Sequence, residues 1–136
     1  MEVESVTSRP MGQTEKLFYG MRNFGGANAC VIAELRGAFS AEKMTDALQR
    51  VVARHALLRC NVTVPEGGEP QFELQARTDV PLAVVEGGSS DVVEELISSA
   101  LETDYYARPW LWELTCVLDR VDPKRFWMIL CVNHSL

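Results

Sequence analysis

Apolar residues recur at helical spacing in two long segments of the chain. In the first, positions i, i+3, i+4, i+7, i+8 and i+11 are Met44, Ala47, Leu48, Val51, Val52 and His55. Ser40 precedes this segment and is a good N-cap residue, because its hydroxyl can accept a hydrogen bond from a first-turn amide. The second segment has the same spacing at Val93, Leu96, Ile97, Ala100 and Leu101. The pattern predicts two long amphipathic helices, the second running to about Tyr105, and a shorter helix over residues 13–23.

Alternating or continuous apolar runs, bounded by turn residues, predict strands between these helices. Six such runs are found, at residues 29–36, 58–64, 71–76, 80–85, 112–118 and 125–132. The segment 65–70 and the Asp122-Pro123 turn predict two hairpins. The expected fold is α+β: an α/β sandwich in which a largely antiparallel mixed sheet carries the two long helices on one face.

The last predicted strand differs from the others because neither of its faces is polar. Residues 126–132 are all apolar, which is typical of a central strand that is covered on both sides. If both long helices lie on one face, the chain has no third long apolar helix for the other. We therefore expect that face to meet a missing C-terminal half of the same protein or a partner subunit, and the isolated chain to self-associate.

Length and composition fit one domain, which we place at residues 13–136 after a flexible lead-in at residues 1–12. The chain has 136 residues and is 47% hydrophobic, enough for one core. A net charge of −6 disfavours a nucleic-acid partner, which would require clustered basic residues. No apolar run approaches the roughly 18 residues of a membrane span, and no signal peptide begins the chain. We expect a cytoplasmic protein.

The four cysteines, at positions 30, 60, 116 and 131, do not have the spacing of a zinc site. Each lies in an apolar or alternating segment, where a free thiol behaves as a small hydrophobic group. We predict buried, reduced thiols and no metal site. Neither GxGxxG nor GxxxxGK[ST] occurs, so nucleotide binding by those motifs is excluded.

Only two histidines are available for acid–base chemistry. His55 continues the apolar stripe of its helix, which favours a structural role. His134 follows the buried strand, between the polar residues Asn133 and Ser135. Its ordinary pKa of about 6.5 suits a general base at neutral pH. On position alone, a structural histidine at the end of a strand is still the stronger interpretation.

Four segments, taken in order, favour a functional role for His134 over a structural one. They are Gly12-Gln13-Thr14-Glu15-Lys16, Leu35-Arg36-Gly37-Ala38-Phe39-Ser40, the run from Ala47-Leu48 through Arg54-His55-Ala56-Leu57-Leu58-Arg59, and Asn133-His134-Ser135-Leu136. Together these segments resemble the N-terminal half of the chloramphenicol acetyltransferase-like superfamily. This superfamily includes condensation domains of nonribosomal peptide synthetases, alcohol O-acetyltransferases and polyketide-associated acyltransferases. The last segment is similar to the first four positions of the HHxxxDG motif.

The resemblance implies that His134 is the catalytic base. It would accept a proton from an alcohol or amine that attacks a thioester, either an acyl-CoA or an acylated phosphopantetheinyl carrier protein. Arg59 resembles the arginine that pairs with the motif aspartate, which would follow two residues after Leu136. Asn133 replaces the first histidine of the motif. No tightly bound cofactor is implied.

The resemblance leaves two interpretations open. In the first, the intact protein is an acyltransferase and this chain, without the opposing half, is inactive. In the second, the chain belongs to a noncatalytic condensation-like domain that serves as an interaction or gating module. The residues that bind substrate are not indicated by the sequence.

Overall fold

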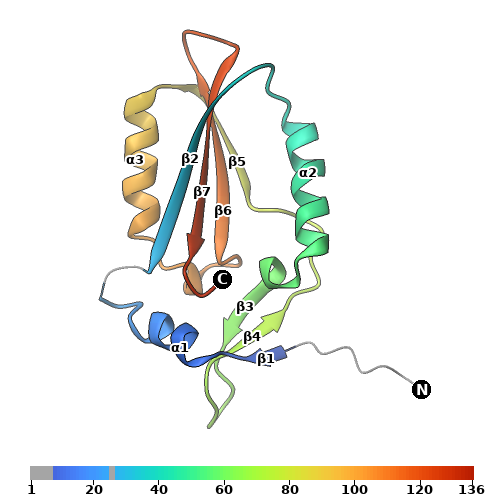
Figure 1. Ribbon diagram of the computed structural model, residues 1–136, viewed down its shortest axis with the longest axis vertical. Helices are drawn as coiled ribbons and strands as arrows, with labels where there is room; N and C mark the ends of the chain where they lie inside the picture. Colours follow the sequence, from blue (N-terminus) through green and yellow to red (C-terminus); the bar gives the residue numbers. More distant parts are fainter. Residues whose placement is uncertain (1–7, 25–26) are drawn as a thin grey trace, which may run out of the picture.

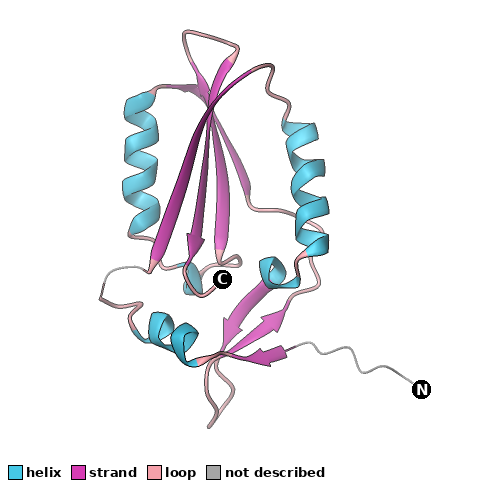
Figure 2. Cartoon of the chain, viewed as in Figure 1, coloured by secondary structure: helices cyan, strands magenta, loops and turns pink. Residues whose placement is uncertain are grey.

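The structure is a computed structural model that describes residues 8–24 and 27–136. Within them, two β-sheets are combined with three α-helices and two short 3₁₀ helices (Figures 1 and 2). The elements in chain order are β1 (Ser8–Pro10), α1 (Gln13–Gly20), β2 (Asn28–Arg36), α2 (Ala41–Arg54), η1 (Ala56–Arg59), β3 (Cys60–Thr63), β4 (Gln71–Leu74), β5 (Leu82–Gly88), α3 (Ser90–Leu101), η2 (Tyr105–Ala107), β6 (Trp112–Asp119) and β7 (Arg125–Asn133).

The larger sheet has the strand order β2-β7-β6-β5. The pairs β2–β7 and β6–β7 are antiparallel, whereas β5 and β6 are parallel. The parallel pair arises because α3 connects β5 to β6 and returns the chain to the end of the sheet at which β5 began. The α+β class and the mixed, largely antiparallel sheet are therefore confirmed, as is the hairpin of the last two strands.

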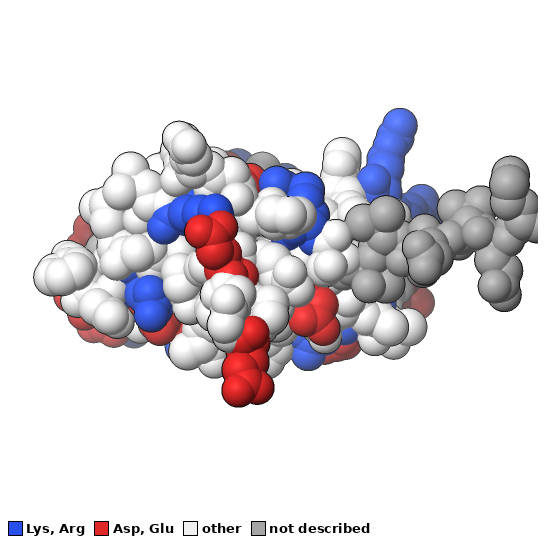
Figure 3. Space-filling model, turned by 90° about the horizontal axis from the view of Figure 1, so that it is seen from below, with Lys and Arg blue, Asp and Glu red and all other residues white. Residues whose placement is uncertain are grey.

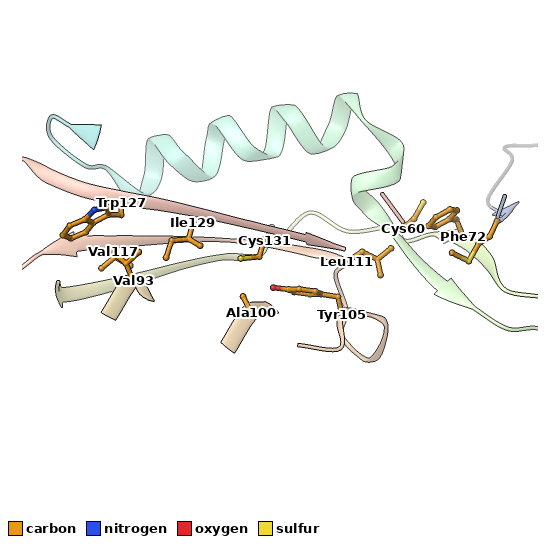
Figure 4. Close-up of a cluster of buried hydrophobic side chains, with 11 residues drawn as sticks. Cys60, Phe72, Val93, Ala100, Tyr105, Leu111, Val117, Trp127, Ile129 and Cys131 are labelled. Carbon is orange, nitrogen blue, oxygen red and sulfur yellow. The ribbon is translucent and has the colours of Figure 1, made fainter. Parts of the chain in front are cut away.

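Strand β7 is central and covered on both faces, but by one helix on each. Trp127, Ile129 and Cys131 belong to a core cluster that includes Val93 and Ala100 of α3 (Figure 4). The alternate residues Met128, Leu130 and Val132 pack in a second cluster with the α2 residues Met44, Leu48 and Val52.

The prediction that both long helices lie on one face is therefore wrong. An amphipathic pattern identifies the apolar side of each helix but not the sheet face that it covers. The expected uncovered face of β7 is absent, so this argument for self-association does not hold. The exposed large apolar residues of this sheet lie on its two edge strands instead: Val31 (64%) and Ile32 (44%) on β2, and Val84 (38%) on β5.

The smaller sheet has the order β1-β4-β3, with antiparallel pairs. Its first strand, Ser8–Pro10, falls in the segment predicted to be a loose lead-in, so that part of the prediction is wrong. The strand is held because Met11, which follows it, is buried, and because β4 offers a pairing edge next to buried Phe72. Residues 1–7 of the predicted lead-in lie outside the described residues.

Helix α2 begins as predicted, because the Ser40 hydroxyl accepts a hydrogen bond from the Lys43 amide at 3.2 Å. The segment that follows the helix differs from the prediction. The strand expected from residue 58 starts only at Cys60, because η1 intervenes. Arg59 is therefore the last residue of a 3₁₀ helix and not a strand residue. The Trp112 indole, which donates to the Leu58 carbonyl at 2.9 Å, ties this short helix to the larger sheet.

The four cysteines are free, and Cys60, Cys116 and Cys131 are buried while Cys30 is half-buried. Burial raises the pKa of all three buried thiols, that of Cys116 to about 11.

Basic and acidic side chains lie interspersed on the face that Figure 3 shows. Across residues 8–24 and 27–136, no helix has the length and apolar character needed to cross a membrane. The same residues contain no cluster of potential metal ligands.

Candidate functional site

Strand β7 ends at Asn133 and passes into a tight turn that presents His134. Asn133 is only 3% exposed, although it is polar. Its side-chain carbonyl accepts hydrogen bonds from the Ser135 amide at 2.9 Å and from the Ser135 hydroxyl at 2.6 Å. This is the local turn that asparagine favours, because its side chain can replace a backbone acceptor. The two bonds fix the backbone on either side of His134.

Two further side chains hold this turn from outside the strand. The Tyr106 hydroxyl donates to the Ser135 hydroxyl oxygen at 3.1 Å, which extends the network into η2. The Asn133 amide group donates to the Asn28 side chain at 3.4 Å. Asn28 in turn donates to the carbonyls of Ala100 at 3.0 Å and Thr103 at 2.7 Å, at the end of α3. The turn is thereby connected to β2, α3 and η2.

The electrostatics of this network follow from its burial. Burial raises the pKa of Tyr106, while its hydrogen bonds to Ser135 and Asn133 act in the opposite direction. Because the phenol stays protonated at neutral pH, it is available as the donor to Ser135. The hydrogen-bonded side chains of Asn28, Tyr106, Asn133 and Ser135 are therefore uncharged, and the imidazole of His134 lies beside them.

His134 itself is exposed, in contrast to the residues on either side of it. Its backbone amide donates to the Ala27 carbonyl at 2.7 Å. Its imidazole stacks on the ring of Phe18 from α1, with centroids 5.3 Å apart and planes inclined by 19°. Stacking covers a ring face and leaves the ring edge, where both nitrogens lie, available for proton transfer. The arrangement suits a positioned, solvent-accessible base.

Asn133 therefore has a visible role at the position where the resembled motif has its first histidine. A carboxamide can accept two hydrogen bonds at its oxygen and donate through its nitrogen at the same time. Asn133 uses both abilities, toward Ser135 and toward Asn28. It is a positioning residue for the turn.

Arg59, the last residue of η1, lies beside α2. It lines an open pocket of about 310 Å³ together with Gln49, Arg77 and Asp79. Its Nε is buried and makes no hydrogen bond to any described residue. Within residues 8–24 and 27–136, no hydrogen bond or ion pair joins Arg59 to His134 or Asn133. The structure thus brings His134 and Asn133 together in one turn but leaves Arg59 separate from them.

Sequence reasoning did not identify Phe18, Asn28 or Tyr106 as parts of the site. Phe18 lies in the short helix that the sequence predicts over residues 13–23, and its apolar side chain carries no sign of a functional role. These residues are far from His134 in sequence, and no local motif marks them. The role of Asn28 depends on the antiparallel pairing of β2 with β7, which places it opposite Asn133. Phe18 and Tyr106 reach the turn from α1 and η2.

No protein-family model and no curated protein matches the sequence. Solved structures do match. The X-domain from teicoplanin biosynthesis aligns with a TM-score of 0.80 and 18% identity over 98% of this chain and 29% of its own. The condensation domain of the monacolin K polyketide synthase MokA aligns at 0.77 and 13% identity, over 94% of this chain and 30% of its own.

A third match is the first condensation domain of the CDA synthetase, with a TM-score of 0.74 and 15% identity. The alignment covers 96% of this chain and 36% of that one. The chain thus has the fold of one part of a condensation domain and spans about a third of the length of these structures. At these identities the likeness concerns the fold.

Proposed function

We propose that this chain is part of an acyltransferase of the condensation type, in which His134 is the general base. The observation that carries the proposal is the His134 turn. An exposed imidazole stacks on Phe18 while buried Asn133 and Ser135 fix the backbone on both sides of it. A purely structural histidine would need neither the buried network that fixes its backbone nor the stacking contact that orients its ring at the surface.

The proposed reaction transfers an acyl group from a thioester to an alcohol or amine. A nitrogen of His134 takes the proton of the acceptor as the acceptor oxygen or nitrogen attacks the thioester carbonyl. The new ester or amide bond forms, the carbon–sulfur bond breaks, and the thiolate leaves with the proton that His134 returns. No covalent enzyme intermediate is required, so one positioned base is sufficient for the proton transfers.

The donor in this proposal is either an acyl-CoA or an acylated phosphopantetheinyl carrier protein. The carrier protein is favoured by one neighbour, a four-domain nonribosomal peptide synthetase whose structure matches 99% of this chain with a TM-score of 0.75. The remaining part of the protein would supply the opposing wall of the site. That wall would set the choice of acceptor and acyl chain.

Arg59 completes the proposal as a positioning residue. Its buried Nε has no hydrogen-bond partner among the described residues, and a buried guanidinium nitrogen without an acceptor is costly. The carboxylate of an aspartate two residues after Leu136, which the motif resemblance implies, would supply that acceptor. That aspartate would also connect Arg59 with the His134 turn.

The test is His134→Ala in the longest natural polypeptide that contains this chain. Acyl transfer from thioester donors is expected to fall by about 100-fold to 10,000-fold, the usual contribution of a general base. His55→Ala is the matched control, because His55 is exposed at the end of α2 and its loss should leave the rate unchanged. Equal turnover of the His134→Ala variant and the unmodified protein would overturn the proposal.

A second candidate function is a noncatalytic interaction module. It is favoured by the similarity to the X-domain from teicoplanin biosynthesis, which has also been solved in complex with OxyB. In this case His134→Ala would change neither acyl transfer nor partner binding. Substitutions on a docking face would weaken binding instead, so the same variant separates the two functions.

A further inference from the structure

Cys30 and Cys131 stand opposite each other in the antiparallel ladder of β2 and β7. Both thiols are free. Cys131 is buried at 1% exposure, whereas Cys30 is half-buried because β2 is an edge strand of the sheet. The candidate site does not use either thiol.

The backbone hydrogen bonds at the two ends of this ladder show which kind of pair the cysteines form. The His134 amide donates to the Ala27 carbonyl and the Gly37 amide donates to the Lys124 carbonyl, each at 2.7 Å. Both pairs continue the register of the ladder. Because hydrogen-bonded and non-hydrogen-bonded pairs alternate, odd-numbered residues of β2 are hydrogen-bonded and Cys30 is not.

A non-hydrogen-bonded pair brings the two side chains close together. Its Cα atoms are about 4.5 Å apart, which lies within the range of about 4.4–6.8 Å that a disulfide spans. The two side chains also lie on the same face: Cys131 belongs to the buried core cluster that includes Ala100 of α3, and Cys30 packs against this cluster. Burial raises the pKa of Cys131, and the neighbouring Cys30 thiol acts in the same direction. The register and the shared face thus place the two side chains next to each other.

We propose that Cys30 and Cys131 are a redox-active thiol pair, which small-molecule disulfides convert into a cross-strand disulfide at the base of the His134 turn. The proposal rests on the fold and does not depend on acyl transfer. The compound class is that of oxidised low-molecular-weight thiols, with glutathione disulfide as the probe.

The exchange begins at Cys30, because its side chain is the more exposed of the two. Its thiolate attacks one sulfur of glutathione disulfide, which forms a mixed disulfide and releases one glutathione thiolate. The Cys131 thiolate then attacks the Cys30 sulfur, which closes the cross-strand bond and releases the second glutathione thiolate. The two protons from the cysteines are taken up by these thiolates, so two thiols are oxidised and one disulfide is reduced.

The disulfide would affect the candidate site through the neighbouring cross-strand pair on the same face of the β2–β7 ladder. Two residues toward the end of the sheet, Asn28 stands opposite Asn133, and their side chains are hydrogen-bonded at 3.4 Å. A covalent bond between positions 30 and 131 would keep the β2 edge against β7 at this point. The Asn28–Asn133 contact that supports the His134 turn would then no longer depend on edge-strand pairing alone.

The experiment incubates the folded, reduced chain with glutathione disulfide and analyses it by mass spectrometry without reduction. The expected product has lost the mass of two hydrogen atoms, and its peptide map links the peptide of Cys30 to that of Cys131. Its midpoint of thermal unfolding should be higher than that of the reduced chain. A map that links other cysteines, or a chain that carries only glutathione adducts, would overturn the proposal.

Three variants test which cysteine reacts first and which two form the bond. Cys131→Ser should accumulate the mixed disulfide at Cys30, whereas Cys30→Ser should remain largely unmodified because the remaining thiols are buried. The double variant Cys60→Ser, Cys116→Ser keeps the pair and should still form the linked peptides. If that variant does not fold, the peptide map of the unmodified chain decides the question by itself.

Discussion

The imidazole of His134 is stacked on the ring of Phe18, with 5.3 Å between the ring centroids and 19° between the planes. The contact joins α1, near the beginning of the chain, to the turn that follows β7. It explains how an exposed histidine can have a defined ring orientation without a hydrogen bond from a described residue to its nitrogens. The short helix α1 is therefore part of the candidate site.

We predict that Phe18→Leu releases the His134 ring. An aromatic pair contributes about 0.5–1.5 kcal/mol beyond its buried area, which the leucine would not replace. In NMR spectra, the His134 ring signals should move toward random-coil positions because the ring-current shift from Phe18 is lost. Leu17→Ala is the control, since Leu17 is 59% exposed on the same helix. His134 signals that do not change in Phe18→Leu would contradict the stacking.

We predict that Asn133→Ala destabilises the chain by about 1–3 kcal/mol, because buried donors of Ser135 lose their acceptor. Urea unfolding followed by fluorescence measures this change. The control is Asn23→Ala, since Asn23 is exposed in the loop after α1. Equal unfolding midpoints for the two variants would show that the carboxamide of Asn133 does not hold the turn.

Trp112→Phe tests the attachment of η1 to the larger sheet. The change removes the indole donor from the Leu58 carbonyl, and we expect a loss of about 1 kcal/mol in the free energy of unfolding. Trp110→Phe is the matched comparison, because Trp110 is also buried but contacts Arg77 through its ring. A larger effect at position 110 than at position 112 would argue against the role of this hydrogen bond.

Alkaline pH should destabilise the fold through its buried thiols. Burial raises the pKa of Cys116 from 9.0 to about 11, so the folded chain retains this proton where the unfolded chain has lost it. The stabilisation is complete below pH 9.0 and is lost as the pH rises from there to about 11. Buried Cys60 and Cys131 also have raised pKa values and act in the same direction.

The measurement for this prediction is the urea midpoint as a function of pH. For the unmodified chain the midpoint should be constant near neutral pH and should fall above pH 9.0, the ordinary thiol pKa. Cys116→Ala should reduce the slope of that decline, because it removes one of the groups that titrate only after unfolding. An unchanged slope in this variant would exclude Cys116 as a contributor.

Most of the elements could be predicted because their signals are local. The spacing of apolar residues in α2 and α3, and the turn between β6 and β7, depend on residues that are close in sequence. The α+β class followed from these elements. His134 could be selected in the same way, from the strand before it and the motif that it resembles, although its role as base is still a prediction.

The pattern of apolar and polar residues specifies where the helices and main strands form, since helical and strand periods are properties of a few neighbouring residues. The folded chain adds what this pattern does not contain: α2 and α3 cover opposite faces of β7, and Ser8–Pro10 forms a strand. It also places Phe18, Asn28 and Tyr106 at the His134 turn. These contacts join residues that are distant along the chain. They depend on how whole elements pack and pair, which no local pattern of residues specifies.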